Sequence, residues 1–275
     1  MKIFKLTNTI DKYLDNTKYN FTTDKNIADI LLVGGQKFEL NDFPNLKGIF
    51  KTGVGTDNLP FELAAQKNIE IRLPSEKTKD IIYEETASYT CFLIFKGMYS
   101  SISEFDTWKK LNRTSLFSTQ LLVMGLGNIG KRVASKMSSF LNVLTYDPLE
   151  NSENELVELL SKADCVTLHL PLTPLTQSFF NNYKLSLLKN GCLLVNTSRG
   201  PLVDEDALYD ELSSNRIKAA FDVFWNEPYK GKLVNISEKY FIKSPHIAST
   251  CNEFLEGLAF DFEFFIQNLK IDQLA

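Results

Sequence analysis

Short apolar runs separated by polar turns divide the first part of the chain into strands and helices. Residues 2–6, 29–34 and 46–52 are apolar runs that end in turn or glycine signals, as buried strands do. Residues 60–67 begin with proline, which suits the start of a helix, and residues 69–73 read as another strand. This alternation predicts an α/β domain with a parallel sheet.

A second series of strands and helices begins at Gln120. Its expected strands are residues 120–124, 142–146, 165–170, 192–196 and 218–224. Between them, Ser152 and Glu155 have the spacing of a capping box, and Asp204 can cap the helix that follows it. The pattern predicts a second parallel sheet with helices around it.

Three further segments join these two series. Residues 83–100 form a long, mostly apolar helical pattern that we expect to link two domains, whereas residues 103–118 are polar and irregular. Residues 252–270 read as one amphipathic helix rich in Phe and Leu. A chain of 275 residues also suits two domains, at roughly 100–200 residues each.

Composition narrows the class of protein. Hydrophobic residues make up 44% and charged residues 23% of the chain, which is a normal globular balance. The net charge of −4 gives no general attraction for nucleic acid or an anionic membrane. The first 14 residues lack the apolar core of a signal peptide, and no run of about 18 apolar residues exists. The four cysteines form no CxxC pair, so we expect reduced thiols in the cytoplasm and no metal site.

Residues 125–130 read Gly-Leu-Gly-Asn-Ile-Gly, which matches the pattern of a dinucleotide-binding fingerprint. The motif alone is weak, but here an apolar strand precedes it and a helix follows it. Its glycines allow a sharp turn and a close approach to a pyrophosphate at the helix N-terminus. The expected contacts are Gly125, Gly127, Asn128, Ile129 and Gly130.

Asp147 ends the next predicted strand, about 20 residues after the fingerprint, where an acidic residue binds the ribose hydroxyls. A 2′-phosphate would meet its negative charge, so NAD is favoured over NADP. The alternative is that residues 125–130 form a glycine turn that binds no ligand. The combination of a preceding strand, a following helix and Asp147 favours dinucleotide binding over this alternative.

Candidate catalytic residues follow successive strands of the second series. Arg199, Asp222 and His246 each come at or just beyond a strand end, and Glu227 follows Asp222 closely. Ligands of doubly wound sheets bind beyond the carboxyl ends of the strands. A guanidinium can grip a carboxylate and a carbonyl oxygen, and a histidine beside a carboxylate can donate a proton. We give the other histidine, His169, no catalytic part. Each residue alone could be structural, but their combination predicts reduction of a 2-oxo acid.

Seven further segments carry a resemblance to a known family. They are VGTDN at 54–58, EETA at 84–87, YDP at 146–148, LHLPLT at 168–173, NTSRG at 196–200, DVFWNEP at 222–228 and SPHIA at 244–248. With the glycine fingerprint, their order and spacing resemble the D-isomer-specific 2-hydroxyacid dehydrogenases over nearly the whole chain.

The resemblance implies the roles of individual residues. Arg199, Glu227 and His246 would be catalytic, with His246 as acid/base, and Arg199 would also bind substrate. Asp222, Pro171 and Thr197 would contact the cofactor, Asp222 near the nicotinamide. Gly53, Val54 and Gly55 would hold the substrate carboxylate. Lys51 stands where some relatives have arginine, and either a contact to a substrate phosphate or a solvated lysine would fit it.

The resemblance also implies two Rossmann-like, doubly wound domains with a cleft between them. The substrate domain would be flavodoxin-like and comprise residues 1–83 and 252–275, and residues 84–251 would bind NAD. A homodimer is expected, although the stretch 104–119, which helps build the dimer in relatives, looks shortened. Three alternatives remain open: a phosphoglycerate dehydrogenase-type enzyme acting on a phosphorylated substrate, a phosphite-oxidising enzyme, and a corepressor-like protein that senses NAD(H).

Overall fold

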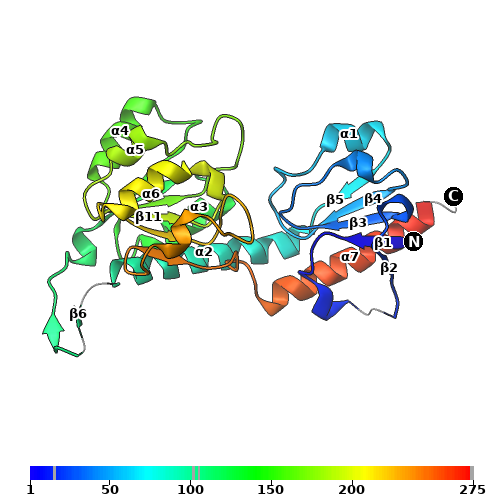
Figure 1. Cartoon of the computed structure of the whole chain (residues 1–275), viewed down its shortest axis with the longest axis horizontal. Coiled ribbons are helices and arrows are strands. Elements are labelled where there is room, and N and C mark those ends of the chain that lie inside the picture. The colour runs from blue at the N-terminus through cyan, green and yellow to red at the C-terminus, as the bar shows by residue number, and fades with distance from the viewer. Residues whose placement is uncertain (15–16, 101–102, 105, 273–275) are drawn as a thin grey trace. The chain divides into compact units, whose positions relative to one another are not determined.

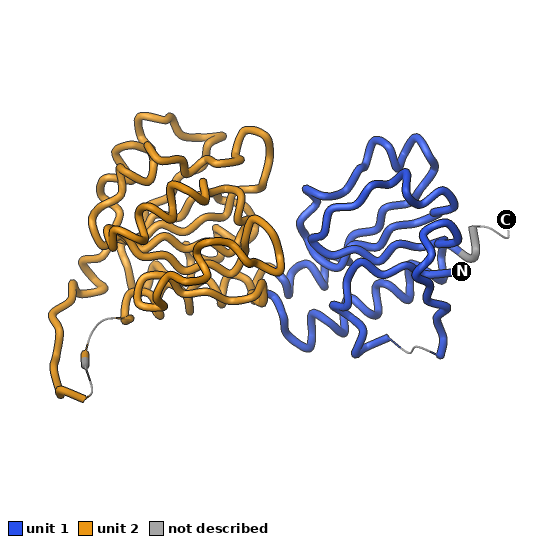
Figure 2. The backbone as a smooth tube through the Cα atoms, in the orientation of Figure 1, with its two compact units in different colours: residues 1–82, 249–275 blue, residues 83–248 orange. Residues whose placement is uncertain are grey.

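The computed structural model describes residues 1–14, 17–100, 103–104 and 106–272. The chain divides into two compact units, unit 1 with residues 1–82 and 249–275 and unit 2 with residues 83–248 (Figure 2). The boundaries expected from the sequence are 83/84 and 251/252, and residues 273–275 of the expected substrate domain lie outside the described residues. In the described part of the chain, every helix is too short or too polar to cross a membrane.

Unit 1 is built on a parallel sheet with the strand order β2-β1-β3-β4-β5. The strands are β1 (Lys2–Lys5), β2 (Asn20–Thr22), β3 (Ile30–Val33), β4 (Gly48–Lys51) and β5 (Glu70–Arg72), and the helices are α1 (Phe61–Gln66), the start of α2 (Glu76–Met98) and α7 (Asn252–Asp272). This is the flavodoxin-like order of a doubly wound sheet.

Both faces of this sheet are buried, which explains its continuous apolar strands. In β3, Ile30 and Leu32 belong to the core on one face, and Leu31 and Val33 belong to the core on the other. Helix α7 covers the first of these faces (Figure 1). It packs so closely that a Cβ on Gly48 would lie 2.6 Å from the Phe265 ring.

Unit 2 has a second parallel sheet, with the order β13-β12-β11-β10-β8-β9. Its strands are β8 (Gln120–Met124), β9 (Asn142–Tyr146), β10 (Cys165–Leu168), β11 (Leu193–Asn196), β12 (Lys218–Phe221) and β13 (Phe241–Lys243), and its helices are the end of α2, α3 (Asn128–Met137), α4 (Glu153–Lys162), α5 (Asn182–Ser186) and α6 (Glu205–Ser213). The strand order reverses beside β8, and ligands bind at such switch points. The predicted capping box at Ser152 and the predicted cap at Asp204 are both confirmed.

The structure differs from the prediction at several short elements. Strand β2 lies at the edge of its sheet and is largely exposed or half-buried, so it has no apolar run to reveal it. The stretch expected to be irregular contains a small hairpin, β6 (Ser103–Glu104) and β7 (Lys109–Lys110). Helix α2 begins at Glu76, seven residues before its predicted start. The apolar pattern did not reveal its first turns because they are mostly polar. Single-turn 3-10 helices occur at Asp11–Tyr13, Lys25–Ile27, Leu40–Asp42, Leu116–Ser118, Gly200–Leu202 and Lys232–Asn235.

Candidate active site

Arg199 lies in a tight turn directly after β11. The buried amide of Asn196 closes this turn, since its Nδ2 donates to the Arg199 carbonyl at 2.8 Å and its Oδ1 accepts from the Ser198 N–H at 3.0 Å. Ser198 Oγ ties the turn to the neighbouring strand end by donating to the Leu170 carbonyl at 2.6 Å. The base of the arginine is thus fixed at the carboxyl edge of the sheet.

Gly200 allows this turn to pack directly on the loop that carries Glu227. A Cβ at Gly200 would lie 2.2 Å from the Phe224 carbonyl carbon and 2.5 Å from the Trp225 nitrogen, so no side chain fits there. Trp225 Nε1 donates to the Val203 carbonyl at 2.8 Å and anchors the same loop from the other side. Two loops distant in sequence are therefore held together by backbone contact.

Asp222 fixes the loop that carries His246. Its buried carboxylate accepts hydrogen bonds from Ser244 Oγ at 2.6 Å, the Ile247 N–H at 2.9 Å and the Ala248 N–H at 2.8 Å. Burial raises the pKa of Asp222, and these hydrogen bonds offset the rise only in part. His246 itself has a φ of +54°, a left-handed conformation that this anchoring maintains.

His246 and Glu227 meet at the carboxyl edge of the sheet. Nδ1 of His246 lies 2.7 Å from Oε2 of Glu227, while Oε1 of Glu227 accepts from the Phe224 N–H at 3.0 Å. Burial acts to raise the pKa of Glu227, but the hydrogen bond and charge of His246, the Phe224 amide and the Arg199 charge outweigh it, and the pKa is lowered. The three predicted catalytic residues thus form one electrostatic group around an ionised carboxylate.

The glycine fingerprint lies between β8 and α3, at the switch point of the sheet. Gly125 has a φ of +91°, and a Cβ there would lie 2.6 Å from the His169 carbonyl oxygen. A Cβ on Gly130 would lie 1.9 Å from the Gly125 carbonyl oxygen, whereas a Cβ on Gly127 would meet nothing within 4 Å. The first and third glycines therefore permit the turn and its packing, and the second leaves the backbone open to a ligand at the start of α3, where Asn128 and Ile129 form the first turn.

Asp147 faces the same loop from the end of β9. Its Oδ2 accepts from the Leu126 N–H at 2.9 Å, and its Oδ1 accepts from the Leu149 N–H at 3.1 Å. The carboxylate is half-buried and retains further lone pairs, so it can also accept from ribose hydroxyls.

The remaining residues expected to contact the cofactor, Pro171, Thr197 and Asp222, differ from one another in exposure and in hydrogen bonding. Pro171 is exposed after β10, and its carbonyl accepts from Thr176 Oγ1 at 2.6 Å. Thr197 is buried, and its hydroxyl lies 2.7 Å from that of Thr90 on α2. Thr197 and Asp222 therefore direct their side chains into the protein. The anchoring role of Asp222 was missed from the sequence, which contains no local signal for a bond to residues 22–26 positions away.

His169 supports the fingerprint turn from behind. Its Nε2 lies 3.0 Å from the buried Thr167 hydroxyl, and its carbonyl contacts the Gly125 turn. Burial lowers the pKa of His169 to about 3, so the ring is neutral at physiological pH.

In unit 1, the expected substrate residues follow β4. Gly53, Val54 and Gly55 are half-buried, and a Cβ on Gly53 would meet nothing within 4 Å. The hypothesis of a solvated Lys51 is wrong, because the side chain is buried and its ammonium donates to the Gly34 carbonyl and to Asn58 Oδ1.

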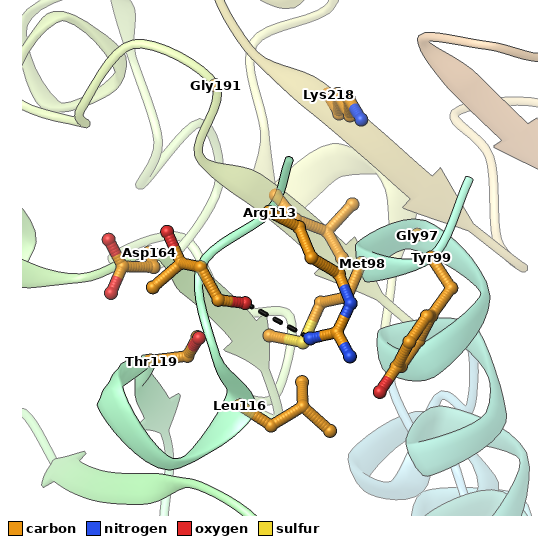
Figure 3. Close-up of a pocket in the computed structure, with 11 residues that line it drawn as sticks. Gly97, Met98, Tyr99, Arg113, Leu116, Thr119, Asp164, Gly191 and Lys218 are labelled. Carbon is orange, nitrogen blue, oxygen red and sulfur yellow. Dashed lines mark hydrogen bonds between the residues drawn. The ribbon is translucent and has the colours of Figure 1, made fainter. Parts of the chain in front are cut away.

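A hollow of about 150 Å³ in unit 2 lies away from these residues (Figure 3). It is lined by the end of α2, by residues of the segment 113–116 and by residues that precede or begin strands, including Thr119, Asp164, Gly191 and Lys218. None of the expected site residues lines it, so the candidate site is defined by the side chains at the opposite edge. Within the described residues, no group of three or more His, Cys, Asp or Glu side chains could hold a metal ion.

Comparison with known proteins gives a consistent family. Residues 96–248 match the family model "D-isomer specific 2-hydroxyacid dehydrogenase, NAD binding domain". The chain is 31% identical to a hydroxypyruvate reductase of Thermotoga maritima over 225 residues, which are 76% of this chain and 72% of the relative. It is 32% identical to a D-3-phosphoglycerate dehydrogenase of Methanocaldococcus jannaschii over 246 residues, 82% of this chain.

This chain spans only 47% of the Methanocaldococcus relative. Among solved structures, a D-lactate dehydrogenase from Aquifex aeolicus, in complex with NAD and lactic acid, is similar over 100% of this chain and 96% of its own, with a TM-score of 0.81 and 24% identity. That likeness supports the fold of both units.

Proposed function

This chain belongs to the D-isomer-specific 2-hydroxyacid dehydrogenases, and from that premise we propose that it interconverts small 2-oxo acids and D-2-hydroxy acids with NAD(H). The observation that carries the proposal is the 2.7 Å pair between His246 Nδ1 and Glu227 Oε2, with the Arg199 charge acting on the same carboxylate. A cation for the substrate oxygens and a proton donor are the two groups that carbonyl reduction requires of the protein.

The pair assigns a role to each ring nitrogen of His246. Because ionised Glu227 accepts at Nδ1, that nitrogen keeps its proton and Nε2 is the one that exchanges a proton with substrate. We propose that Nε2 protonates the carbonyl oxygen at C2 as hydride arrives, leaving a neutral ring still bonded to Glu227. Arg199 holds the substrate carboxylate and polarises the carbonyl, since its planar fork can contact both oxygens.

The cofactor proposed for unit 2 is NAD, which when bound supplies or accepts the hydride. The open backbone at Gly127 and the N–H groups that start α3 suit a pyrophosphate. Asp147 would accept hydrogen bonds from the adenosine ribose and repel a 2′-phosphate. Gly125, Asn128, Ile129, Gly130, Pro171, Thr197 and Asp222 complete the proposed surroundings of the cofactor.

We assign the substrate carboxylate to the backbone of Gly53, Val54 and Gly55 in unit 1, where Gly53 is open to a ligand. Unit 1 is thus the proposed substrate domain and unit 2 the NAD-binding domain. We further propose a cytoplasmic homodimer. All four cysteines are thiols, as a reducing compartment favours, and Phe92, Phe117 and Phe140 of unit 2 are 49%, 84% and 52% exposed.

The direct test is NADH oxidation with glyoxylate, hydroxypyruvate, pyruvate, phosphohydroxypyruvate and branched 2-oxo acids, with chiral analysis of the product. Turnover of at least one acid to its D-isomer is expected, and His246→Ala should lower kcat by roughly 10²–10⁴. Tight NADH binding without turnover of any acid would favour the NAD(H)-sensing alternative instead.

A further inference from the structure

Lys51 is a buried lysine at the carboxyl end of a central strand. Its side chain is 3% exposed at the end of β4, directly before the glycine loop. Lysine is almost never fully buried unless its ammonium is bonded, because desolvation of the charge is costly. Here the ammonium donates to the Gly34 carbonyl and, at 2.6 Å, to Asn58 Oδ1.

These bonds close the loop at its base. Lys51 and Asn58 are the residues on either side of the stretch 52–57, so the bond between them joins the two ends of that stretch. Asn58 Nδ2 in turn donates to the Gly34 carbonyl at 3.0 Å and to the Gln36 carbonyl at 2.6 Å. The loops after β3 and β4 are thus joined by one network, which we call the lysine clasp: Lys51, Asn58, and the Gly34 and Gln36 carbonyls.

Two other cations lie in the neighbouring loops of unit 1. Lys37 is exposed in the loop after β3 and lines a separate hollow with Lys25 and Asp42, and Arg72 pairs with Glu70. Asp57, within the closed loop, is exposed and adds a negative charge. The cation at the base of the glycine loop, Lys51, is therefore committed to the lysine clasp.

We propose that Lys51 is a positioning residue that shapes the 53–55 backbone, and that the enzyme takes a 2-oxo acid with an uncharged group at C3. This rests on the proposed function and names its substrate class. A C3 phosphate would need a cation with donors directed at it, and Lys51 directs its donors to the clasp. The activity named for the Methanocaldococcus relative, on a phosphoglycerate, therefore does not transfer to this chain.

The test compares hydroxypyruvate with 3-phosphohydroxypyruvate in NADH oxidation. For the wild-type protein, we expect kcat/KM at least about tenfold higher for hydroxypyruvate. Lys51→Met removes the ammonium but keeps the length of the side chain, and Asn58→Ala opens the clasp from its other end. Each should lower kcat/KM about tenfold or more for both acids, leaving their ratio within about threefold of wild type, because a displaced loop misplaces either substrate.

Lys51→Arg and the double variant Lys51→Met/Asn58→Ala are the controls. We expect Lys51→Arg to recover part of the kcat/KM that Lys51→Met loses. We expect kcat/KM of the double variant to be no lower than that of the single variants, because both residues belong to one network. A wild-type preference for the phosphorylated acid, or a loss in Lys51→Met confined to that acid, would overturn the inference while leaving the proposed function intact. If wild type reduces no 2-oxo acid of any kind, the proposed function fails and the inference with it. If Lys51→Met does not fold, the wild-type ratio of kcat/KM for hydroxypyruvate and 3-phosphohydroxypyruvate decides whether the inferred substrate class is correct.

Discussion

At the scale of single residues, the candidate site depends on which atoms are already committed to hydrogen bonds. Glu227 uses one carboxylate oxygen for the Phe224 amide and the other for His246, so its charge is held in one direction. Asp222, which resembles a cofactor ligand in sequence, uses both oxygens for the His246 loop. The two carboxylates near His246 thus have separate tasks: Glu227 bonds to the imidazole ring, and Asp222 holds the backbone of the loop that carries it.

Replacing Glu227 with glutamine tests the first of these tasks. The amide side chain has the same shape as the carboxylate and can still accept from Nδ1 of His246, but it lacks the charge that stabilises the imidazolium. We expect Glu227→Gln to lower kcat for 2-oxo acid reduction by about 10²–10⁴ with little change in NADH affinity. Stopped-flow kinetics and NADH fluorescence titration would measure the two quantities. A kcat within about threefold of wild type would remove Glu227 from the mechanism.

Arg199→Lys tests the geometry of the cation. A lysine keeps the positive charge beside Glu227 but cannot offer two parallel N–H groups to a carboxylate. We expect kcat/KM for the preferred acid to fall by about 10²-fold or more, and a NADH dissociation constant close to wild type. Full activity in this variant would show that a point charge suffices.

At the scale of elements, the site is assembled by loops that follow β11, β12 and β13 and contact one another through backbone. Gly200→Ala tests the closest of these contacts, because its Cβ would overlap Phe224 and Trp225. We expect a loss of about 1–3 kcal/mol in the free energy of unfolding and a lower kcat. Gly127→Ala is the stability control within the same unit, since a Cβ there meets nothing within 4 Å, and its free energy of unfolding should stay within about 0.5–1 kcal/mol of wild type.

We propose that Asp147, in the turn after β9, sets the preference between NAD and NADP. Asp147→Ala removes the negative charge expected at the ribose, together with the bond to the Leu126 amide. We expect weaker NADH binding and a smaller preference for NADH over NADPH, measured as kcat/KM for each cofactor with the same 2-oxo acid. An unchanged preference would contradict the ribose role of Asp147.

Sequence patterns predicted the long buried strands and the turn of the glycine fingerprint, because each depends on a local run of residues. They also named Glu227 and His246, whose side chains meet in the structure, although their catalytic roles stay a prediction. Strand β2 and the β6–β7 hairpin were missed, since edge pairing leaves little apolar periodicity. The burial of Lys51 could not be predicted either, because its two acceptors belong to different loops. Contacts between distant loops are decided by tertiary packing, which no single window of sequence contains.

At the scale of the whole molecule, two units with separate cores are joined where the chain passes residues 82/83 and 248/249. Their unfolding need not coincide, so a single free energy does not describe the protein without a probe for each unit. Both tryptophans, Trp108 and Trp225, belong to unit 2. Tryptophan fluorescence therefore reports the unfolding of the proposed cofactor domain alone.

That probe allows a test of His169, which is half-buried behind the glycine fingerprint. With a folded pKa of about 3 and an unfolded pKa near 6.5, His169 binds more protons when unit 2 is unfolded at intermediate pH. Its contribution to stability is therefore complete above about pH 6.5 and is lost as pH falls towards 3. Between about pH 7 and pH 5, urea unfolding followed by tryptophan fluorescence should show a loss of about 2 kcal/mol in wild type that His169→Asn does not share. Equal pH dependence in the two proteins would mean that the ring is protonated in the folded state, and that the fingerprint turn tolerates a charge behind it.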